Sequence, residues 1–309
     1  MLIKIENPAR LLRQEELLGD TAELTNLDLR FDERQGILWK YISARATPYF
    51  SHELLDDIRT VQNRVRNREN GQGRFRGHTP VRYVVFASHR PGVFSLGGDL
   101  RLFRQLIARR DRNALFRYAR KATDAVYYHA ANFGQSMSFS LVQGIAMGGG
   151  FEAALAGNVL VAEKGSRLGF PEVLFGLFPG MGAYTLLRRR VDAATAERLI
   201  LSARNYEAEE LHAMGVVDVL CEPGEGEDYI CSYVSRQSSR PGAVAFRQAI
   251  NRTNAIDREE LYGIADAWVE TAMTLPDDCL RRIDRLVANQ GRNFGEAPVP
   301  AFAPIAHAG

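Results

Sequence analysis

The chain has 309 residues, of which 46% are hydrophobic and 25% charged, and its formal net charge is +2. This length allows a domain with a sizeable core and an appendage, and the near-neutral charge argues against a broad nucleic-acid-binding surface. The three cysteines have no CxxC spacing, which is typical of reduced thiols rather than of a disulfide frame or a zinc site.

The elements of the first half alternate between strands and helices. Residues 24–43 predict two strands around a turn at 32–36, and residues 51–70 predict a helix capped by Ser51. We expect a loop at 71–80. The elements that follow are a buried strand at 81–88, helices at 100–110 and 114–133, and a strand at 136–144 that leads into a glycine-rich helix.

The second half is mainly helical. Short strands are predicted at 158–163, 166–170 and 216–220. Helices are predicted at 182–191, 193–202, 208–214 and 228–239, with two longer ones before residue 290. This order indicates an α/β core with a helical appendage. We divide the chain into an N-terminal arm (1–20), a core (21–205), a helical C-terminal region (206–290) and a flexible tail (291–309).

The sequence predicts neither a secretory signal peptide nor a membrane span. The first 20 residues carry acids and no apolar signal-peptide core. The most apolar stretch, 137–162, is interrupted by polar residues and glycines, so it does not predict a membrane span. We therefore expect a cytoplasmic protein.

Three consecutive glycines, Gly148 to Gly150, open the helix that carries Glu152. One interpretation is a dinucleotide site, because Gly148, Gly150 and Ala153 fit G-x-G-x-x-A. Against it, the motif lies in mid-chain and three residues separate it from the preceding strand. The other interpretation is an oxyanion hole, in which free N–H groups at the helix start bind a developing negative charge.

A second glycine pair supports the oxyanion hole. Gly97 and Gly98 lie in VFSLGGDL, after the strand at 81–88 and before a helix. Each loop alone is more often a tight strand-to-helix turn. Two such loops indicate the paired donors that an acyl-transfer or enolate-forming site needs.

Two glutamates complete the candidate site. Glu152 lies just inside the glycine helix, and Glu172 follows in the apolar segment GFPEVLFGLFPGMGAY. An apolar setting raises the pKa of a carboxyl group toward neutrality, which suits a general acid or base. Glu172 also fits a plain helix-start acid after Pro171. Together the two acids suit proton transfer at C2 and C3 of an acyl thioester.

These segments resemble the crotonase (enoyl-CoA hydratase/isomerase) superfamily from about residue 25 to residue 290. The resemblance rests on VFSLGGDL, on residues 142–184 and on the spacing between them. GGGFEAAL, PEVLFGLFPGMGAY and AWVETAM are most similar to the diffusible-signal-factor synthases. The resemblance implies a spiral of ββα turns with a helical C-terminal region that forms homotrimers.

The resemblance also implies roles for individual residues. Gly98 and Gly149 would supply the oxyanion-hole N–H groups, with glycine at 98 where many hydratases have alanine. Glu172 would remove the C2 proton, and Glu152 would protonate the departing hydroxyl and later position water. The signal synthases dehydrate 3-hydroxyacyl chains on acyl carrier protein and hydrolyse the cis-2-enoyl thioester to a free cis-2-unsaturated fatty acid.

Other residues have two readings each. Met147, Leu174, Met181 and Trp268 are candidates for an acyl-chain tunnel, although methionines fill cores equally well and a tryptophan on such a helix face is more often part of the core. The arginines at 101, 104, 109 and 110, and those at 188–190, fit either a solvated face or a docking site for an acidic carrier protein or CoA phosphates. No histidine has metal-ligand spacing, so we expect no metal, and the absence of G-x-S-x-G disfavours a serine hydrolase.

Three functions follow from this reading. The first is synthesis of a cis-2-enoic fatty acid signal, without a cofactor beyond the carrier protein or CoA that bears the substrate. The second is CoA-dependent hydration or isomerisation. The third is a non-catalytic role in which the protein binds another protein, for example a sensor kinase. An enzyme could also bind a sensor kinase as a second role.

Overall fold

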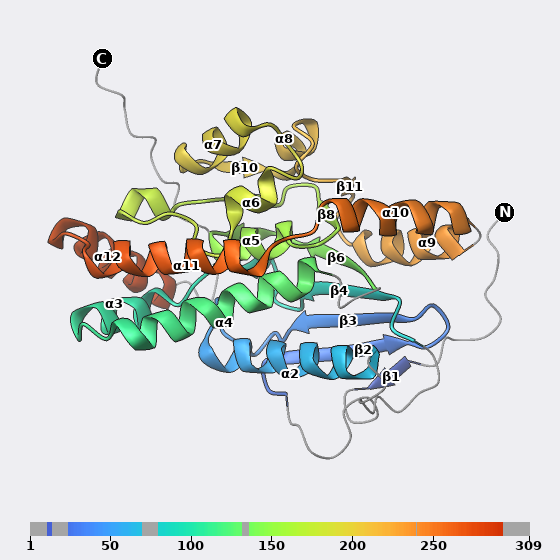
Figure 1. The fold of residues 1–309 in the computed structure, drawn as a ribbon, viewed down its shortest axis with the longest axis horizontal. Coiled ribbons are helices and arrows are strands. Elements are labelled where there is room, and N and C mark those ends of the chain that lie inside the picture. Colours follow the sequence, from blue (N-terminus) through green and yellow to red (C-terminus); the bar gives the residue numbers. More distant parts are fainter. Residues whose placement is uncertain (1–10, 14–23, 70–79, 132–135, 239, 293–309) are drawn as a thin grey trace.

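A computed structural model describes residues 11–13, 24–69, 80–131, 136–238 and 240–292 (Figure 1). Residues 71–79 of the expected loop, residues 293–309 of the expected tail and most of the N-terminal arm lie outside these ranges. Within the expected arm, Leu11–Arg13 forms strand β1, which pairs with the next strand of the chain. This part of the arm is therefore fixed to the sheet by backbone pairing.

The core of the molecule is a seven-stranded sheet in the order β1-β2-β3-β4-β6-β8-β11. Its strands after β1 are β2 (Leu27–Asp32), β3 (Ile37–Ile42), β4 (Tyr83–Ser88), β6 (Met137–Val142), β8 (Val159–Glu163) and β11 (Val219–Cys221). The pairs from β3 to β11 are parallel, and β2 and β3 form the predicted antiparallel hairpin. Because β11 comes from the helical C-terminal region, the sheet crosses the boundary expected at residue 205.

A second, four-stranded sheet has the order β10-β9-β7-β5. It contains β5 (Val93–Ser95), β7 (Ile145–Met147), β9 (Arg167–Gly169) and β10 (Asn205–Glu207). Only β9 was predicted from the sequence. The strands β5, β7 and β10 were not predicted, and β7 occupies the segment expected to link the strand at 136–144 to the glycine helix.

Helices cover the sheets on the side that holds the larger core. They are α2 (His52–Glu69), α3 (Leu100–Ala108), α4 (Arg112–Ala130), α5 (Gly149–Leu155), α6 (Ala183–Leu187), α7 (Ala193–Leu201), α8 (Ala208–Ala213) and the 3₁₀ helix η1 (Glu172–Phe175). The start of α2 is fixed as predicted, because the Ser51 hydroxyl accepts a hydrogen bond from the Leu54 N–H at 3.2 Å.

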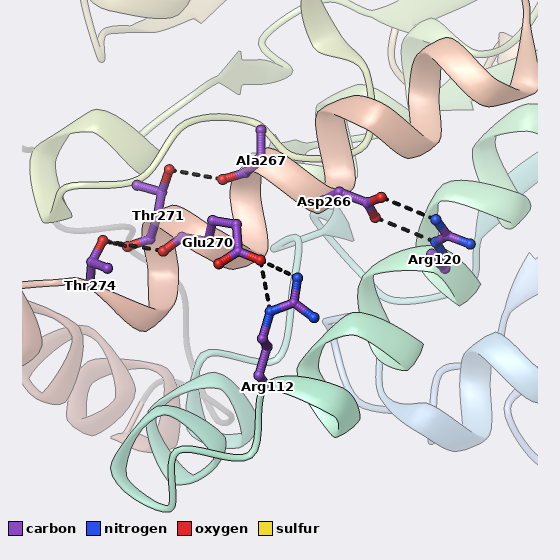
Figure 2. Close-up of polar contacts among 7 residues, drawn as sticks. All are labelled: Arg112, Arg120, Asp266, Ala267, Glu270, Thr271 and Thr274. Atoms are coloured by element: carbon purple, nitrogen blue, oxygen red, sulfur yellow. Dashed lines mark hydrogen bonds and ion pairs between the residues drawn. The ribbon is translucent and has the colours of Figure 1, made fainter.

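Four helices form the C-terminal region: α9 (Gly226–Ser238), α10 (Pro241–Thr253), α11 (Arg258–Met273) and α12 (Asp277–Arg292). After the predicted helix at 228–239 the structure has three helices where two were expected. Helix α11 runs beside α4 (Figure 1). Three ion pairs join them: Arg112 to Glu270 and Arg120 to Asp266 (Figure 2), and Arg258 to Asp124. The expected trimer stays a prediction.

Two negative findings apply to the described ranges. No helix there is long and apolar enough to cross a membrane. The same residues contain no cluster of three histidine, cysteine or acidic side chains that could hold a metal ion.

Candidate active site

The two predicted glycine loops meet. Strands β5 and β7 are parallel neighbours, so the loops that follow them leave the small sheet at the same edge. A Cβ atom on Gly97 would lie 3.0 Å from the Gly149 nitrogen and 2.7 Å from the Met147 carbonyl oxygen. This close backbone approach explains why both loops need glycine.

Gly98 and Gly149, the two candidate oxyanion-hole residues, lie on the two adjoining glycine loops. Gly149 is the first residue of α5, where a backbone N–H has no partner within the helix. Among the described residues, neither the Gly98 N–H nor the Gly149 N–H donates a hydrogen bond. The site therefore offers two backbone donors on adjoining loops to a carbonyl oxygen that gains negative charge.

Glu152 is buried, with 1% of its surface exposed. Its Oε1 atom accepts hydrogen bonds from the Met181 N–H at 2.8 Å and the Ala183 N–H at 2.9 Å, at the start of α6. Burial raises the pKa of Glu152 to about 7, and the backbone hydrogen bonds limit the rise because they stabilise the carboxylate. The group can therefore hold either charge state near neutral pH.

Glu172 lies across the glycine turn from Glu152. A Cβ atom on Gly148 would be only 2.3 Å from Glu172 Oε1, so the carboxyl group packs on bare backbone. Although the residue as a whole is partly exposed, Oε2 is buried and has no hydrogen-bond partner among the described residues. Burial raises the pKa of Glu172 well above its ordinary value, and the charge of Glu152 raises it further.

Backbone contacts bring the two acids together from separate elements. The Gly148 N–H donates to the Gly169 carbonyl at 2.8 Å, and the Phe151 and Phe170 rings stack at 4.6 Å. The carboxyl groups interact electrostatically, so they titrate as a pair. The first proton lost comes from Glu152, whose anion has backbone donors, and Glu172 keeps its proton. Once Glu152 has lost its proton, the pair holds one proton and one negative charge.

The dinucleotide interpretation of the glycines does not fit this geometry. The Gly148 backbone is covered by the Glu172 carboxyl group and Gly149 faces the other glycine loop. An acid at that position repels a pyrophosphate instead of leaving room for one.

The four candidate pocket residues are all near the site but do not share one role. Met181 lines a buried cavity of about 10 Å³, which is room for about one water molecule. Trp268 is buried against Gly180 and lies 5.0 Å from the Phe103 ring. Met147 is buried at the end of β7, and Leu174 is partly buried in η1. The last three are not among the residues that line that cavity.

The arginines divide into two groups. Arg104 pairs with Asp284 of α12 at 2.9 Å, whereas Arg101, Arg109 and Arg110 are exposed. In the second cluster, Arg189 donates to the carbonyls of Asn254 and Ala255, and Arg190 donates to those of Val216 and Gly157. Arg189 and Arg190 therefore tie loops together, and the exposed group on α3 keeps the docking interpretation open.

Sequence reasoning missed a buried polar group behind the site. Lys40 lies in β3 with Leu38 and Ile42 on the same face, and it is 2% exposed. His129 and Gln62 are each 3% exposed and line the same cavity. A lysine on the inward face of an otherwise apolar strand was the signal that the sequence offered.

Sequences similar to this chain belong to enoyl-CoA hydratases and related proteins. The family model for enoyl-CoA hydratase/isomerase matches residues 72–267, more than half of the chain. A protein named probable enoyl-CoA hydratase from Mycobacterium avium is 30% identical over 209 residues, which is 68% of this chain and 70% of that protein. The chain matches a peroxisomal fatty acid beta-oxidation multifunctional protein of Arabidopsis thaliana at 40% identity, but spans only 12% of its length.

Solved structures agree with the family match at the level of fold. DspI of Pseudomonas aeruginosa superposes with a TM-score of 0.61 at 22% identity, over 88% of this chain and 99% of that one. The paired glycine loops and carboxyl groups thus lie in a crotonase fold of parallel sheets and flanking helices. The chain belongs to the enoyl-CoA hydratase/isomerase family.

Proposed function

We propose that the protein dehydrates a 3-hydroxyacyl thioester, carried by acyl carrier protein or CoA, and then hydrolyses the cis-2-enoyl thioester to a free cis-2-unsaturated fatty acid signal. The observation that carries the proposal is the buried pair of carboxyl groups beside two unpaired backbone donors. A carbonyl oxygen held by Gly98 and Gly149 stabilises both an enolate and a tetrahedral intermediate.

Dehydration uses the pair with its proton on Glu152. The Glu172 carboxylate takes the C2 proton, the electrons form the C2–C3 double bond, and the C3 hydroxyl leaves as water with the proton of Glu152. The step ends with Glu172 protonated and Glu152 ionised. This is the protonation state that burial favours in the resting protein, since Glu152 has the backbone donors.

Hydrolysis then follows from the same state. The ionised Glu152 accepts a proton from water, whose oxygen attacks the thioester carbonyl carbon. The oxyanion is held by the glycine N–H groups until the C–S bond breaks. The thiol then leaves with the proton that Glu152 took from the water, which returns Glu152 to its ionised form. The buried carboxylate thus serves as the base of the second step after it has served as the acid of the first.

The motifs support the signal-synthase form of this function. The resemblance to the diffusible-signal-factor synthases rests on the GGD loop, the GGGFEAAL segment and the PEVLFGLFPGMGAY segment. All three segments contribute residues to the site: Gly98, then Gly149 with Glu152, and then Glu172 with Met181. We further propose that the protein works as a homotrimer.

A second candidate function is reversible hydration of an enoyl-CoA with the thioester left intact. Ionised Glu152 and protonated Glu172 favour this hydration. Adding water to C3 requires a base, which is Glu152, and an acid, which is Glu172. The names of the curated relatives, such as the probable enoyl-CoA hydratase of Mycobacterium avium, point the same way.

The test measures products and thiol release with purified protein and 3-hydroxydodecanoyl-acyl carrier protein. We expect free cis-2-dodecenoic acid and one thiol per acid. Glu152→Gln and Glu172→Gln should each lower the rate by about 100-fold or more, a typical contribution of general acid–base catalysis. Glu163→Gln is the matched control, since Glu163 is also buried but contacts Gln143 and Gly226 outside the site.

Three outcomes separate the functions. An intact thioester with water added across C2–C3 of an enoyl-CoA would replace the first function by the second. Exchange of the C2 proton with D2O should be lost in Glu172→Gln and retained in Glu152→Gln if Glu172 is the C2 base. A biological output that survives both substitutions would establish the non-catalytic role instead.

A further inference from the structure

The first glycine loop is held in place by a segment far from it in sequence. The Phe50 N–H donates to the Gly97 carbonyl oxygen at 2.8 Å, and Phe50 forms an isolated parallel β-bridge with Gly98. The Gly97 carbonyl and the Gly98 N–H belong to one planar trans peptide group, so they point in opposite directions. The hydrogen bond that fixes this carbonyl therefore also fixes the direction of the Gly98 N–H.

A buried hydroxyl group completes the anchor. The Tyr118 hydroxyl donates to the Phe50 carbonyl oxygen at 2.5 Å and accepts from the Asp99 N–H at 3.2 Å. The Asp99 N–H belongs to the peptide group that follows Gly98, whereas the Phe50 N–H holds the peptide group that precedes it. Tyr118 therefore links the two segments whose hydrogen bonds fix both peptide groups of Gly98.

The Tyr118 ring is itself fixed by its surroundings. Tyr118 lies in α4 and is 2% exposed. Its ring makes edge contacts with His52 of α2 and Phe103 of α3, at 5.3 Å and 5.1 Å between ring centroids. Burial raises the pKa of Tyr118, so the hydroxyl keeps its proton and remains a donor. Three helices thus hold one hydroxyl group against the glycine loop.

The loop needs this support because its own residues are permissive. Gly97 has φ 90°, a conformation that glycine adopts freely, and Gly98 also lacks a side chain. A Cβ atom on Gly98 would lie 2.5 Å from the Phe103 ring, so the ring occupies the space where an alanine would place its methyl group. Two consecutive glycines leave the backbone direction open to many conformations. Hydrogen bonds from outside the loop must therefore set it.

The second candidate donor is held independently. Gly149 opens α5, and the preceding Gly148 N–H donates to the Gly169 carbonyl at 2.8 Å. Within the part of the chain that the structure describes, the hydrogen bonds of the Tyr118 hydroxyl go to Phe50 and Asp99 and not to this helix start. A change at the hydroxyl therefore acts on one of the two donors and leaves the other in place.

We propose that Tyr118 is a positioning residue of the candidate oxyanion hole, whose hydroxyl sets the direction of the Gly98 N–H through Phe50 and Asp99. The inference rests on the proposed function for the role of Gly98. It applies equally to hydration, because both reactions need a polarised thioester carbonyl. Tyr118 acts through the loop and takes no part in proton transfer. Without the hydroxyl, Phe50 and Asp99 lose their shared partner and the Gly98 peptide group turns, and a misplacement of about 1 Å is enough to weaken such a donor.

The first test measures carbonyl polarisation without turnover. The probe is a dodecanoyl-CoA ketone analogue in which a methylene group separates the carbonyl from sulfur, with carbon-13 at the carbonyl. It has no 3-hydroxyl group to eliminate and no thioester to hydrolyse. Hydrogen bonds from the loop weaken the C=O bond and lower its stretching frequency, which infrared difference spectra of the bound probe record. We expect a higher frequency in Tyr118→Phe than in the unchanged protein, with the affinity for the probe little changed.

The second test measures turnover in the product assay. Tyr118→Phe should lower kcat about tenfold, which is a part of the roughly 100-fold or more that loss of a whole oxyanion-hole donor costs. KM should stay nearly unchanged, because the donor binds the oxyanion more strongly than the ground-state carbonyl. A merely structural role would lower the amount of folded protein and leave kcat per folded molecule as it was.

Matched variants assign the effect to the hydroxyl. Tyr41→Phe is the control, since Tyr41 is also 2% exposed and its hydroxyl donates to Glu227 at 2.8 Å, within the second hydrophobic cluster on the other face of the large sheet. It should leave both the carbonyl frequency and kcat unchanged. Tyr118→Met has a flexible side chain without a hydroxyl and gives the same comparison if Tyr118→Phe does not fold.

The outcomes are distinct from those of the proposed function. An unchanged carbonyl frequency in the folded Tyr118 variant overturns the positioning role, as does an equal shift in Tyr41→Phe. A loss of affinity with the frequency and kcat unchanged also overturns it, because Tyr118 would then support only the pocket. If the unchanged protein turns over no substrate, the frequency shift still decides the role of Tyr118, since the probe undergoes neither reaction. Normal product formation without a frequency shift keeps the function and removes the positioning role.

Discussion

The charge states of Glu152 and Glu172 make the stability of the folded protein depend on pH. Glu152 and Glu172 have raised pKa values in the folded protein, chiefly because of burial. The folded state therefore holds protons that the unfolded chain releases above its ordinary glutamate pKa of 4.5. The contribution of Glu152 to stability is fully present below that pH and is lost as the pH rises through its folded pKa of about 7.

This linkage predicts the effect of removing the charge of Glu152. Glu152→Gln keeps an oxygen that can accept the Met181 and Ala183 hydrogen bonds but has no proton to lose. We expect the variant to be more stable than the unchanged protein at pH 8, by roughly 2–3 kcal/mol, and equally stable at pH 4.5. Urea unfolding at several pH values measures this difference, and a difference independent of pH would contradict the raised pKa.

At the scale of single elements, the turn from β7 into α5 determines where Glu172 can lie. Gly148 has φ 54° and ψ −125°, a backbone conformation that other residues rarely adopt. Its missing side chain is also the space that Glu172 Oε1 occupies. The glycine thus permits the turn and leaves space for the Glu172 carboxyl group at the same time.

Alanine substitutions separate these two roles. Gly148→Ala should lower kcat by on the order of 100-fold, because the new Cβ displaces the Glu172 carboxyl group. Gly165→Ala is the control, since Gly165 also has positive φ, at 77°, but a Cβ there meets nothing within 4 Å. Both variants should lose about 1–2 kcal/mol of stability, and only the first should lose activity. Loss of kcat in Gly165→Ala would mean that backbone strain alone explains the effect.

Over the whole molecule, the C-terminal helices brace the catalytic segments. Arg282 of α12 donates to the Leu174 carbonyl in η1 at 2.8 Å, and Cys279 of the same helix packs on Gly176. Trp268 of α11 packs on Gly180, next to the Met181 N–H that holds Glu152. The helical region therefore supports both acids from behind, although it is far from them in sequence.

The magnitudes indicate which contacts hold this region in place. Arg112 and Glu270 are 47% and 58% exposed, so their ion pair (Figure 2) is screened by solvent and should contribute little to stability. Trp268 is buried, and Trp268→Ala should cost about 3–5 kcal/mol and lower kcat. Arg112→Ala is the comparison, with urea unfolding and turnover as the measurements. Equal losses in the two variants would show that the ion pairs hold the helices instead.

The sequence by itself determined the features that depend on local pattern. It predicted the hairpin of β2 and β3, the buried strands β4, β6 and β8 and the capped helix α2, because alternation, helical spacing and caps are local signals. It also singled out the residues that the structure brings together at the candidate site: Gly98, Gly149, Glu152, Glu172 and Met181. Whether they have the predicted roles is the subject of the experiments above.

Tertiary structure decided what depends on pairing between distant segments. The strands β5, β7 and β10 have three residues each and exist because neighbours in the small sheet complete their hydrogen bonds. The protonation order of the two glutamates depends on N–H groups from the start of α6, 29 and 31 residues beyond Glu152. Lys40 and His129 share one cavity only because β3 packs beneath α4. Burial and electrostatic coupling are properties of assembled surroundings, and no single segment of the chain contains them.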